Sequence, residues 1–157
     1  MKPKSKLERQ LLVLHIFRFC EVTEYAEIMN PINDVSRRTI DRDIAELTEA
    51  GLLNVEFSRK HNGFIHLRSR REPTPTGNKA KQAHYNKLKR LRHVMFEFHS
   101  GCDDNIVDWY GEQYPNVSKR TMQRDLQILK GIGYRIWYDF WDKEYKYEFP
   151  SGMTDIF

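Results

Sequence analysis

Apolar positions along the first half of the chain follow helical spacing in three consecutive segments. Residues 6–20 place apolar side chains three and four apart, which predicts an amphipathic helix, and a shorter helix is expected over residues 22–30. Residues 30–34, Asn-Pro-Ile-Asn-Asp, predict a turn. Ser36 is a favourable N-cap for a third helix, which we expect to run to about Ala50.

After the third helix the spacing changes to that of short strands. Gly51 stands where the end of a helix favours a left-handed residue. Residues 53–57 and 64–67 predict two strands, which residues 58–63 join as a hairpin. The second half predicts the same order, with helices over 88–98, over 104–113 and from Ser118 to Gly133, then strands over 135–140 and 145–149. Residues 79–87 either extend the first of these helices or belong to the segment before it.

The third predicted helix is also repeated in sequence. Residues 35–44 align without a gap with residues 117–126. Both segments read Val, Ser, Arg or Lys, Arg, Thr, apolar, any residue, Arg, Asp, apolar, and the match extends to Gly51 and Gly133. Self-similarity over such a window, flanked by the same predicted elements, indicates that one structural unit occurs twice.

Three helices followed by a β-hairpin make a winged helix-turn-helix domain. We therefore predict an α+β fold, mainly α, built from two such domains in tandem. The first domain is expected over residues 1–68 and the second over 87–157, with a basic linker that contains proline and glycine over 69–86. A length of 157 residues, 39% hydrophobic and 31% charged, suits two small globular domains with modest cores.

The charge of the chain is mildly basic and unevenly distributed. The formal net charge is +4 and the sequence pI is about 9.0, which suits a polyanionic partner. Residues 68–92 hold nine Lys and Arg residues against a single acid, Glu72. This basic segment either follows DNA phosphates between two binding sites or is a solvated linker and helix start.

Several protein classes are disfavoured by the motifs of this sequence. Cys20 and Cys102 are too few for a disulfide framework, and neither forms a zinc-site spacing with a nearby histidine. We see no signal-peptide pattern and no apolar run of membrane-spanning length, so we expect a cytoplasmic protein without a membrane partner. Without a phosphate loop, nucleophile elbow or metalloprotease motif, we expect no enzyme, cofactor or metal.

The repeated helix predicts one apolar face and one basic face. With Ile40 facing the core, Ile44 and Leu47 fall on the same side of a helical wheel, and Arg38 and Arg42 fall opposite. In a helix-turn-helix this helix enters the major groove, where arginine can bond to guanine and glutamine to adenine. A single exposed arginine is usually just solvated, but the recurrence of both arginines in the second copy favours DNA contact.

The acidic residue of the repeated pattern is expected to act differently. Asp43 and Asp125 lie near the edge of the apolar face. A carboxylate that faced a phosphate would be repelled. We therefore expect both to pair or cap within their own domains and not to contact DNA.

At these residues the chain resembles the N-terminal winged helix-turn-helix domain of WYL-type and DeoR-type bacterial transcriptional regulators. The resemblance lies in residues 36–51 and 118–133, and the hairpin over 133–139 also resembles the wing of that family. It implies transcription regulation, with repression expected, double-stranded DNA as the partner, and a third helix that faces DNA. Such regulators normally carry a C-terminal ligand-sensing or oligomerising domain, whereas here a second winged helix follows.

The candidate DNA contacts lie on the two third helices and on the first hairpin. Arg59 and Lys60, at the tip of the first hairpin, either contact DNA phosphates and the minor groove or form a solvated turn. The full set of candidates is Ser36, Arg37, Arg38, Thr39, Arg42, Arg59 and Lys60 in the first copy, and Ser118, Lys119, Arg120, Thr121, Gln123, Arg124 and Gln127 in the second.

The tip of the second hairpin differs from that of the first. Residues 140–144, Phe-Trp-Asp-Lys-Glu, suit a protein partner or packing better than DNA. Three functions stay open: a sequence-specific regulator, a protein-interaction module or inhibitor on a winged-helix scaffold, and a phage or plasmid replication initiator. A homodimer on a palindrome and a monomer that reads a site through its tandem domains both fit.

Overall fold

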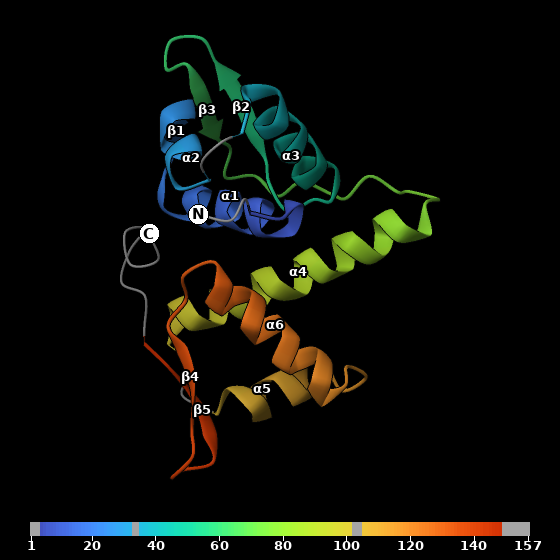
Figure 1. Ribbon diagram of the computed structural model, residues 1–157. Helices are drawn as coiled ribbons and strands as arrows, with labels where there is room; N and C mark the ends of the chain where they lie inside the picture. The colour runs from blue at the N-terminus through green and yellow to red at the C-terminus, as the bar shows by residue number, and fades with distance from the viewer. Residues whose placement is uncertain (1–3, 33–34, 102–104, 149–157) are drawn as a thin grey trace. The chain divides into compact units, whose positions relative to one another are not determined.

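The computed structural model describes residues 4–32, 35–101 and 105–148 of the chain (Figure 1). The fold is α+β and mainly helical, with small antiparallel sheets, and this part of the sequence prediction is confirmed. The chain divides into two compact units, Met1–Lys89 and Arg90–Phe157. Over the described ranges, no helix has the length and apolar character needed to cross a membrane.

The first unit is built on three helices and a three-stranded antiparallel sheet. The strands lie in the order β1-β3-β2, so β3 is the central strand. A capping box at Ser5, in which the side chains of Ser5 and Glu8 bond each other's backbone N–H groups, begins the first helix. The elements are α1 (Lys6–Phe19), β1 (Val22–Glu24), α2 (Tyr25–Ile32), α3 (Arg37–Glu49), β2 (Val55–Ser58) and β3 (Gly63–His66).

Two local predictions in the first unit are wrong. Residues 22–24 are a strand and not the start of a helix, because they pair with 63–65 and place Thr23 in the interior opposite Phe64. The turn predicted at 30–34 is also displaced, because α2 continues through Pro31 to Ile32. A proline so close to the end of a helix removes only one helical hydrogen bond. The remainder of that predicted turn, residues 33–34, lies outside the described residues.

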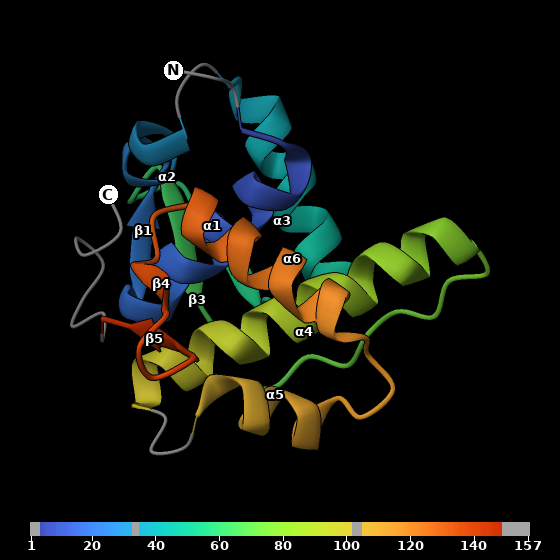
Figure 2. The same cartoon turned by 60° about the horizontal axis from the view of Figure 1, so that its bottom comes forward.

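Helix α1 forms the centre of the first unit. Every residue from Gln10 to Phe17 is buried, as expected for a helix that is covered on more than one side. It packs against both α2 and α3 (Figure 2). The apolar core around it comprises Leu11, Leu12, Val13, Leu14, Ile16, Phe17, Tyr25, Ile28, Ile32, Ile40, Ile44, Leu47, Leu52, Leu53 and Phe64.

The second unit repeats the order of three helices and a hairpin. Helix α4 (Lys79–Ser100) supplies its first helix through the part that follows Lys89, and α5 (Ile106–Gln113) and α6 (Lys119–Gly131) follow. Strands β4 (Ile136–Asp139) and β5 (Glu144–Tyr147) pair in a two-stranded antiparallel sheet. The buried apolar residues are Leu91, Val94, Met95, Phe98, Ile106, Trp109, Tyr110, Met122, Leu126, Leu129, Ile132, Tyr134 and Ile136.

The segment expected as a linker has two parts. Residues 69–78 contain no helix or strand, and the helix α4 begins at Lys79. Part of the extended stretch lies against the end of α3, where the N–H of Thr74 donates to the carbonyl of Glu49 at 2.8 Å. Gly51 is required there, since its φ is +70° and an added Cβ would come within 2.9 Å of the Pro73 nitrogen.

Candidate nucleic-acid interface

The repeated helices α3 and α6 begin with the same hydroxyl cap. Ser36 accepts a hydrogen bond from the backbone N–H of Thr39 at 3.3 Å, and Ser118 accepts one from Thr121 at 3.2 Å. In each cap the two hydroxyl oxygens also bond to each other, at 3.1 Å in the first unit and 3.0 Å in the second. Both helices therefore start at a fixed residue and present their first turns in the same way.

A buried ion pair anchors the opposite face of each helix. Asp43 is 1% exposed and lies 2.7 Å from Nε of Arg9 in α1. Asp125 is fully buried and lies 2.6 Å from Nε of Arg90 in α4. In both cases Nη2 of the arginine donates to the second carboxylate oxygen, so the contact is bidentate. The expectation that these aspartates pair within their own units is confirmed.

The two arginines of these pairs are structural residues that the motif analysis missed. Arg9 and Arg90 each stand two residues after a leucine in the first helix of their unit, in a Leu-x-Arg pattern that the copies share. This short pattern is the signal that could have identified them. The second pair gains a further partner, because the hydroxyl of Tyr110 donates to Asp125 at 2.6 Å. Burial, and then that hydrogen bond, raise the pKa of Tyr110.

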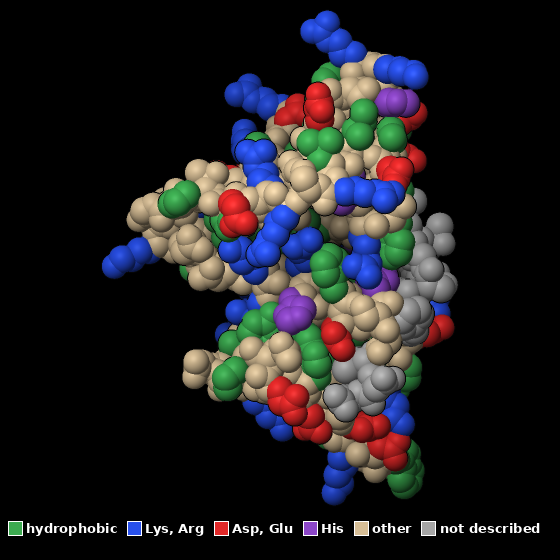
Figure 3. All heavy atoms as spheres, turned by 180° about the vertical axis from the view of Figure 1, so that it is seen from behind, with side chains coloured by type: hydrophobic (Ala, Val, Ile, Leu, Met, Phe, Trp, Pro, Cys, Tyr) green, Lys and Arg blue, Asp and Glu red, His purple; other side chains and the backbone are tan. Residues whose placement is uncertain are grey.

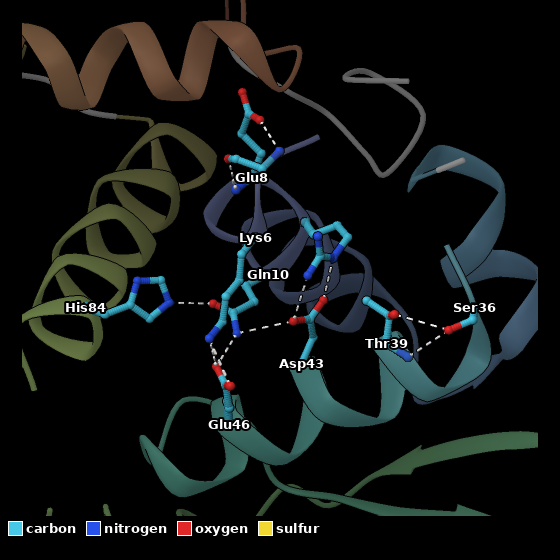
Figure 4. Close-up of polar contacts among 10 residues, drawn as sticks. Lys6, Glu8, Gln10, Ser36, Thr39, Asp43, Glu46 and His84 are labelled. Atoms are coloured by element: carbon cyan, nitrogen blue, oxygen red, sulfur yellow. Dashed lines mark hydrogen bonds and ion pairs between the residues drawn. The ribbon is translucent and has the colours of Figure 1, made fainter. Parts of the chain in front are cut away.

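A polar network in the first unit extends from the Arg9–Asp43 ion pair to the start of α4 (Figure 4). The side-chain amide of Gln10, which is fully buried, donates to Glu46 at 2.9 Å, and its oxygen accepts from Nε2 of His84 at 2.7 Å. Lys6 also pairs with Glu46, at 2.7 Å. Burial lowers the pKa of His84, so the neutral ring that this contact uses is favoured.

The outward faces of α3 and α6 carry arginines without partners. Arg38 and Arg42 are exposed and lie one helical turn apart on α3, and Arg120 and Arg124 do the same on α6. Among the residues that the structure describes, none of the four has a hydrogen bond or ion pair. Their guanidinium groups are therefore available to an external acceptor.

The other candidate residues also lie at the surface, with one difference between the copies. Thr39 and Thr121 are half-buried, and the remaining candidates on α3, α6 and the first hairpin are exposed. Arg37 is already engaged, because its guanidinium lies 4.0 Å from the centre of the Tyr25 ring and donates to Asn62. The hydroxyl of Tyr25 in turn donates to Asp41, and burial together with that bond raises the pKa of Tyr25 to about 12.

The tips of the two hairpins differ in chemistry. Arg59 and Lys60 are exposed at the tip of the first, whereas the corresponding part of the second presents Phe140 and Trp141, which are 82% and 96% exposed. Figure 3 shows Lys and Arg side chains at the end of the β2–β3 hairpin and hydrophobic side chains at the end of β4–β5. The second turn is held by Asp139, which accepts from the backbone N–H groups of the two residues that follow Phe140.

Several cations of the basic segment 68–92 are paired within the chain. Arg68 pairs with Glu21, and Lys81 lies 2.9 Å from Glu49. Arg90 belongs to the buried pair described above. These contacts reduce the charge that the segment can offer to phosphates.

A metal-binding arrangement is not seen in the described ranges, where no group of three or more His, Cys, Asp or Glu side chains could hold an ion. Cys20 is half-buried at the end of α1 and forms no disulfide among the described residues. Its burial raises the pKa of the thiol, which makes the reactive thiolate less available. Cys102 lies outside the described residues.

Comparison with known proteins does not assign the chain to a family. No protein-family model, curated protein or solved structure matches it.

Proposed function

We propose that the chain is a sequence-specific DNA-binding transcriptional regulator made of two winged helix-turn-helix domains, and that it represses by occupying its site. In this proposal α3, α6 or both enter the major groove of double-stranded DNA. The observation that carries it is the pair of unpartnered arginines repeated on each helix, Arg38 with Arg42 and Arg120 with Arg124. An arginine fork matches the O6 and N7 acceptors of guanine.

The element order of each unit supports the winged-helix interpretation. Three helices are followed by an antiparallel hairpin in both, and in the first unit the short strand β1 adds to that hairpin. The buried ion pairs of Asp43 and Asp125 fix which face of the third helix points inward. The outward face is then free to lie in a groove about 12 Å wide.

Selection from a random pool of duplex DNA at near-physiological salt tests this function. We expect enrichment of a defined motif, and two half-sites would indicate either a dimer or the use of both units by one chain. A variant with Arg42→Ala and Arg124→Ala serves as the matched control and should lose the enrichment. If only salt-sensitive background binding is recovered from the unmodified chain, the proposal fails.

A second candidate function is favoured by one observation at the second hairpin. Phe140 and Trp141 expose almost their whole side chains, beside the acidic Asp142. Exposed aromatic residues of this kind are enriched at protein interfaces. In this alternative the hairpin binds a protein, and Phe140→Ser with Trp141→Ser should abolish capture of that partner while leaving the selected DNA motif unchanged.

A further inference from the structure

A cavity of about 310 Å³ lies within the second unit, between the start of α5, the first turn of α6 and the β4–β5 hairpin. Its volume is at the lower end of the range typical of small-molecule sites. The side chains that could contact a ligand there are Asp108, Lys119, Gln123, Tyr138, Lys143 and Tyr145. These side chains are two cations, one carboxylate, two phenol rings and an amide, and Asn105 and Val107 complete the lining.

In the first unit, a hydrogen bond joins the start of α3 to the hairpin turn, at the place that corresponds to this cavity. Arg37 opens α3 and donates to Asn62, the residue with positive φ in the first hairpin turn. Lys119 opens α6, and Lys143 is the residue with positive φ in the second turn. The second unit therefore replaces a donor and an acceptor with two ammonium groups. Neither lysine has a partner within the described ranges and both line the cavity, so an anion bound there would gain charge-assisted hydrogen bonds from their ammonium groups.

The first residues of α2 and α5 differ in size and in polarity. Tyr25 opens α2 and Ile106 opens α5, and both are buried. The ring of Tyr25 lies beneath Arg37 and its hydroxyl reaches Asp41, the fifth residue of α3. Isoleucine is shorter and has no hydroxyl. It therefore cannot bridge to Gln123, which is the fifth residue of α6 and lines the cavity.

The remaining lining indicates the kind of molecule that would fit. Tyr138 and Tyr145 both line the cavity and form an edge-to-face pair with ring centres 5.2 Å apart, and Phe140 packs against Tyr138 at 5.1 Å. Aromatic side chains in such a lining suit a flat heterocycle. Gln123 can both donate to and accept from the polar edge of such a ring. Asp108 would repel a phosphate at close range, but it can accept hydrogen bonds from ribose hydroxyls or an exocyclic amine.

We propose that this cavity binds a nucleoside monophosphate, with the phosphate between Lys119 and Lys143 and the base against the tyrosine pair. The same chemistry is offered by a free mononucleotide and by one nucleotide of a single strand. The site shares Lys119 and Gln123 with the candidate DNA-contacting face of α6, but it does not use the outward arginines, so its binding can be tested without duplex DNA.

Calorimetric titration of the full chain tests the site without duplex DNA. The probes are AMP, GMP, CMP and UMP, with inorganic phosphate and the parent nucleosides as partial ligands. We expect one or more monophosphates to bind with a stoichiometry of one, at least about tenfold more tightly than phosphate or nucleoside alone. The proposal is overturned if none of the four monophosphates binds saturably at millimolar concentration.

Variants locate the binding. Lys119→Met and Lys143→Asn should each weaken monophosphate binding by at least about tenfold and change nucleoside binding little. Asparagine tolerates the positive φ of position 143. The matched control is Lys130→Met, which removes a charge from the far end of the same helix. Ile106→Tyr, which introduces the residue that opens α2 in the first unit, should fill the cavity and abolish monophosphate binding. If this variant does not fold, the two lysine variants test the site on their own.

Binding that survives in both lysine variants would refute the assignment. A single-stranded trinucleotide separates the two sources of the ligand. Equal affinity for mononucleotide and trinucleotide supports a free small molecule as ligand, whereas affinity about tenfold higher for the trinucleotide supports a nucleotide held within a strand. Because duplex DNA is absent from every arm, failure here leaves the proposed regulatory function to its own test.

Discussion

The buried ion pair of the second unit allows a direct test of what holds α6 in place. Asp125 is fully buried and accepts from Arg90, whose side chain is 16% exposed, and from the hydroxyl of Tyr110. Replacing Asp125 with asparagine keeps the shape and one acceptor oxygen but removes the negative charge. The guanidinium of Arg90 is then left in a mostly buried position without its counter-ion.

The size of the effect follows from burial. Removing one partner of a buried pair costs about 3–5 kcal/mol, and we expect about 3 kcal/mol because Arg90 retains some solvent contact. The matched control is Glu148→Gln, which breaks the pair with Arg135 at 2.7 Å, where both side chains are more than half exposed. Breaking such a surface pair costs about 0–1 kcal/mol.

The assay can report on the second unit by itself. All three tryptophans, Trp109, Trp137 and Trp141, lie in that unit, and Trp109 is 8% exposed. Tryptophan fluorescence during urea unfolding therefore follows this unit, and Asp125→Asn should lower the midpoint by more than about 1 M. The double variant Arg90→Met with Asp125→Leu should recover much of the loss. If Asp125→Asn costs no more than Glu148→Gln, the argument from buried charge is wrong.

Three further outcomes are expected. Arg124→Ala should cost about 1–3 kcal/mol of binding free energy at the selected DNA site and relax sequence specificity locally, which a gel-shift titration can measure. The control Lys130→Ala, at the far end of α6, should change the affinity by less. Arg59→Ala should weaken binding to all sequences alike and reduce the slope of log affinity against log salt by about 1, and an unchanged slope would remove this residue from the interface. Burial lowers the pKa of His84 in the folded state, so stability that is complete above the ordinary pKa of 6.5 is lost as pH falls through the lowered value, because the buried ring must then carry a charge. Thermal unfolding by circular dichroism at pH 7.5 and pH 5 should show this loss, and His84→Leu should diminish it.

The helices that carry the candidate interface were predictable because their signals are local. Ser36 and Ser118 cap the third helices as their sequence context indicates, and the apolar stripe through Ile40 and Leu47 is buried. The strand β1 was not predictable in this way, because three residues carry too little periodicity. Its conformation depends on pairing with β3, which is distant in sequence.

The start of α4 and the cavity of the second unit depend on tertiary contacts. The helix begins at Lys79, before the apolar spacing becomes clear, and its first turns are stabilised by contacts such as Lys81 with Glu49. The cavity lies beside the first residue of α5, where Ile106 stands and the first unit opens α2 with the larger Tyr25, and the neighbours of Ile106 in sequence line it. The sequence repeat could not show this, since the two residues fall outside the aligned window.

The twin Arg–Asp pairs limit which substitutions each unit can accept. Neither Asp43 nor Asp125 can drift alone, because a single change leaves its arginine partner as an uncompensated buried charge. The presence of aspartate at both positions is therefore explained by packing within each unit and says little about function. Positions that differ between the copies and have no buried partner are more informative. One example is the hairpin tip, where Lys60 in the first unit corresponds to Trp141 in the second. At such positions the two units present different side chains to their surroundings.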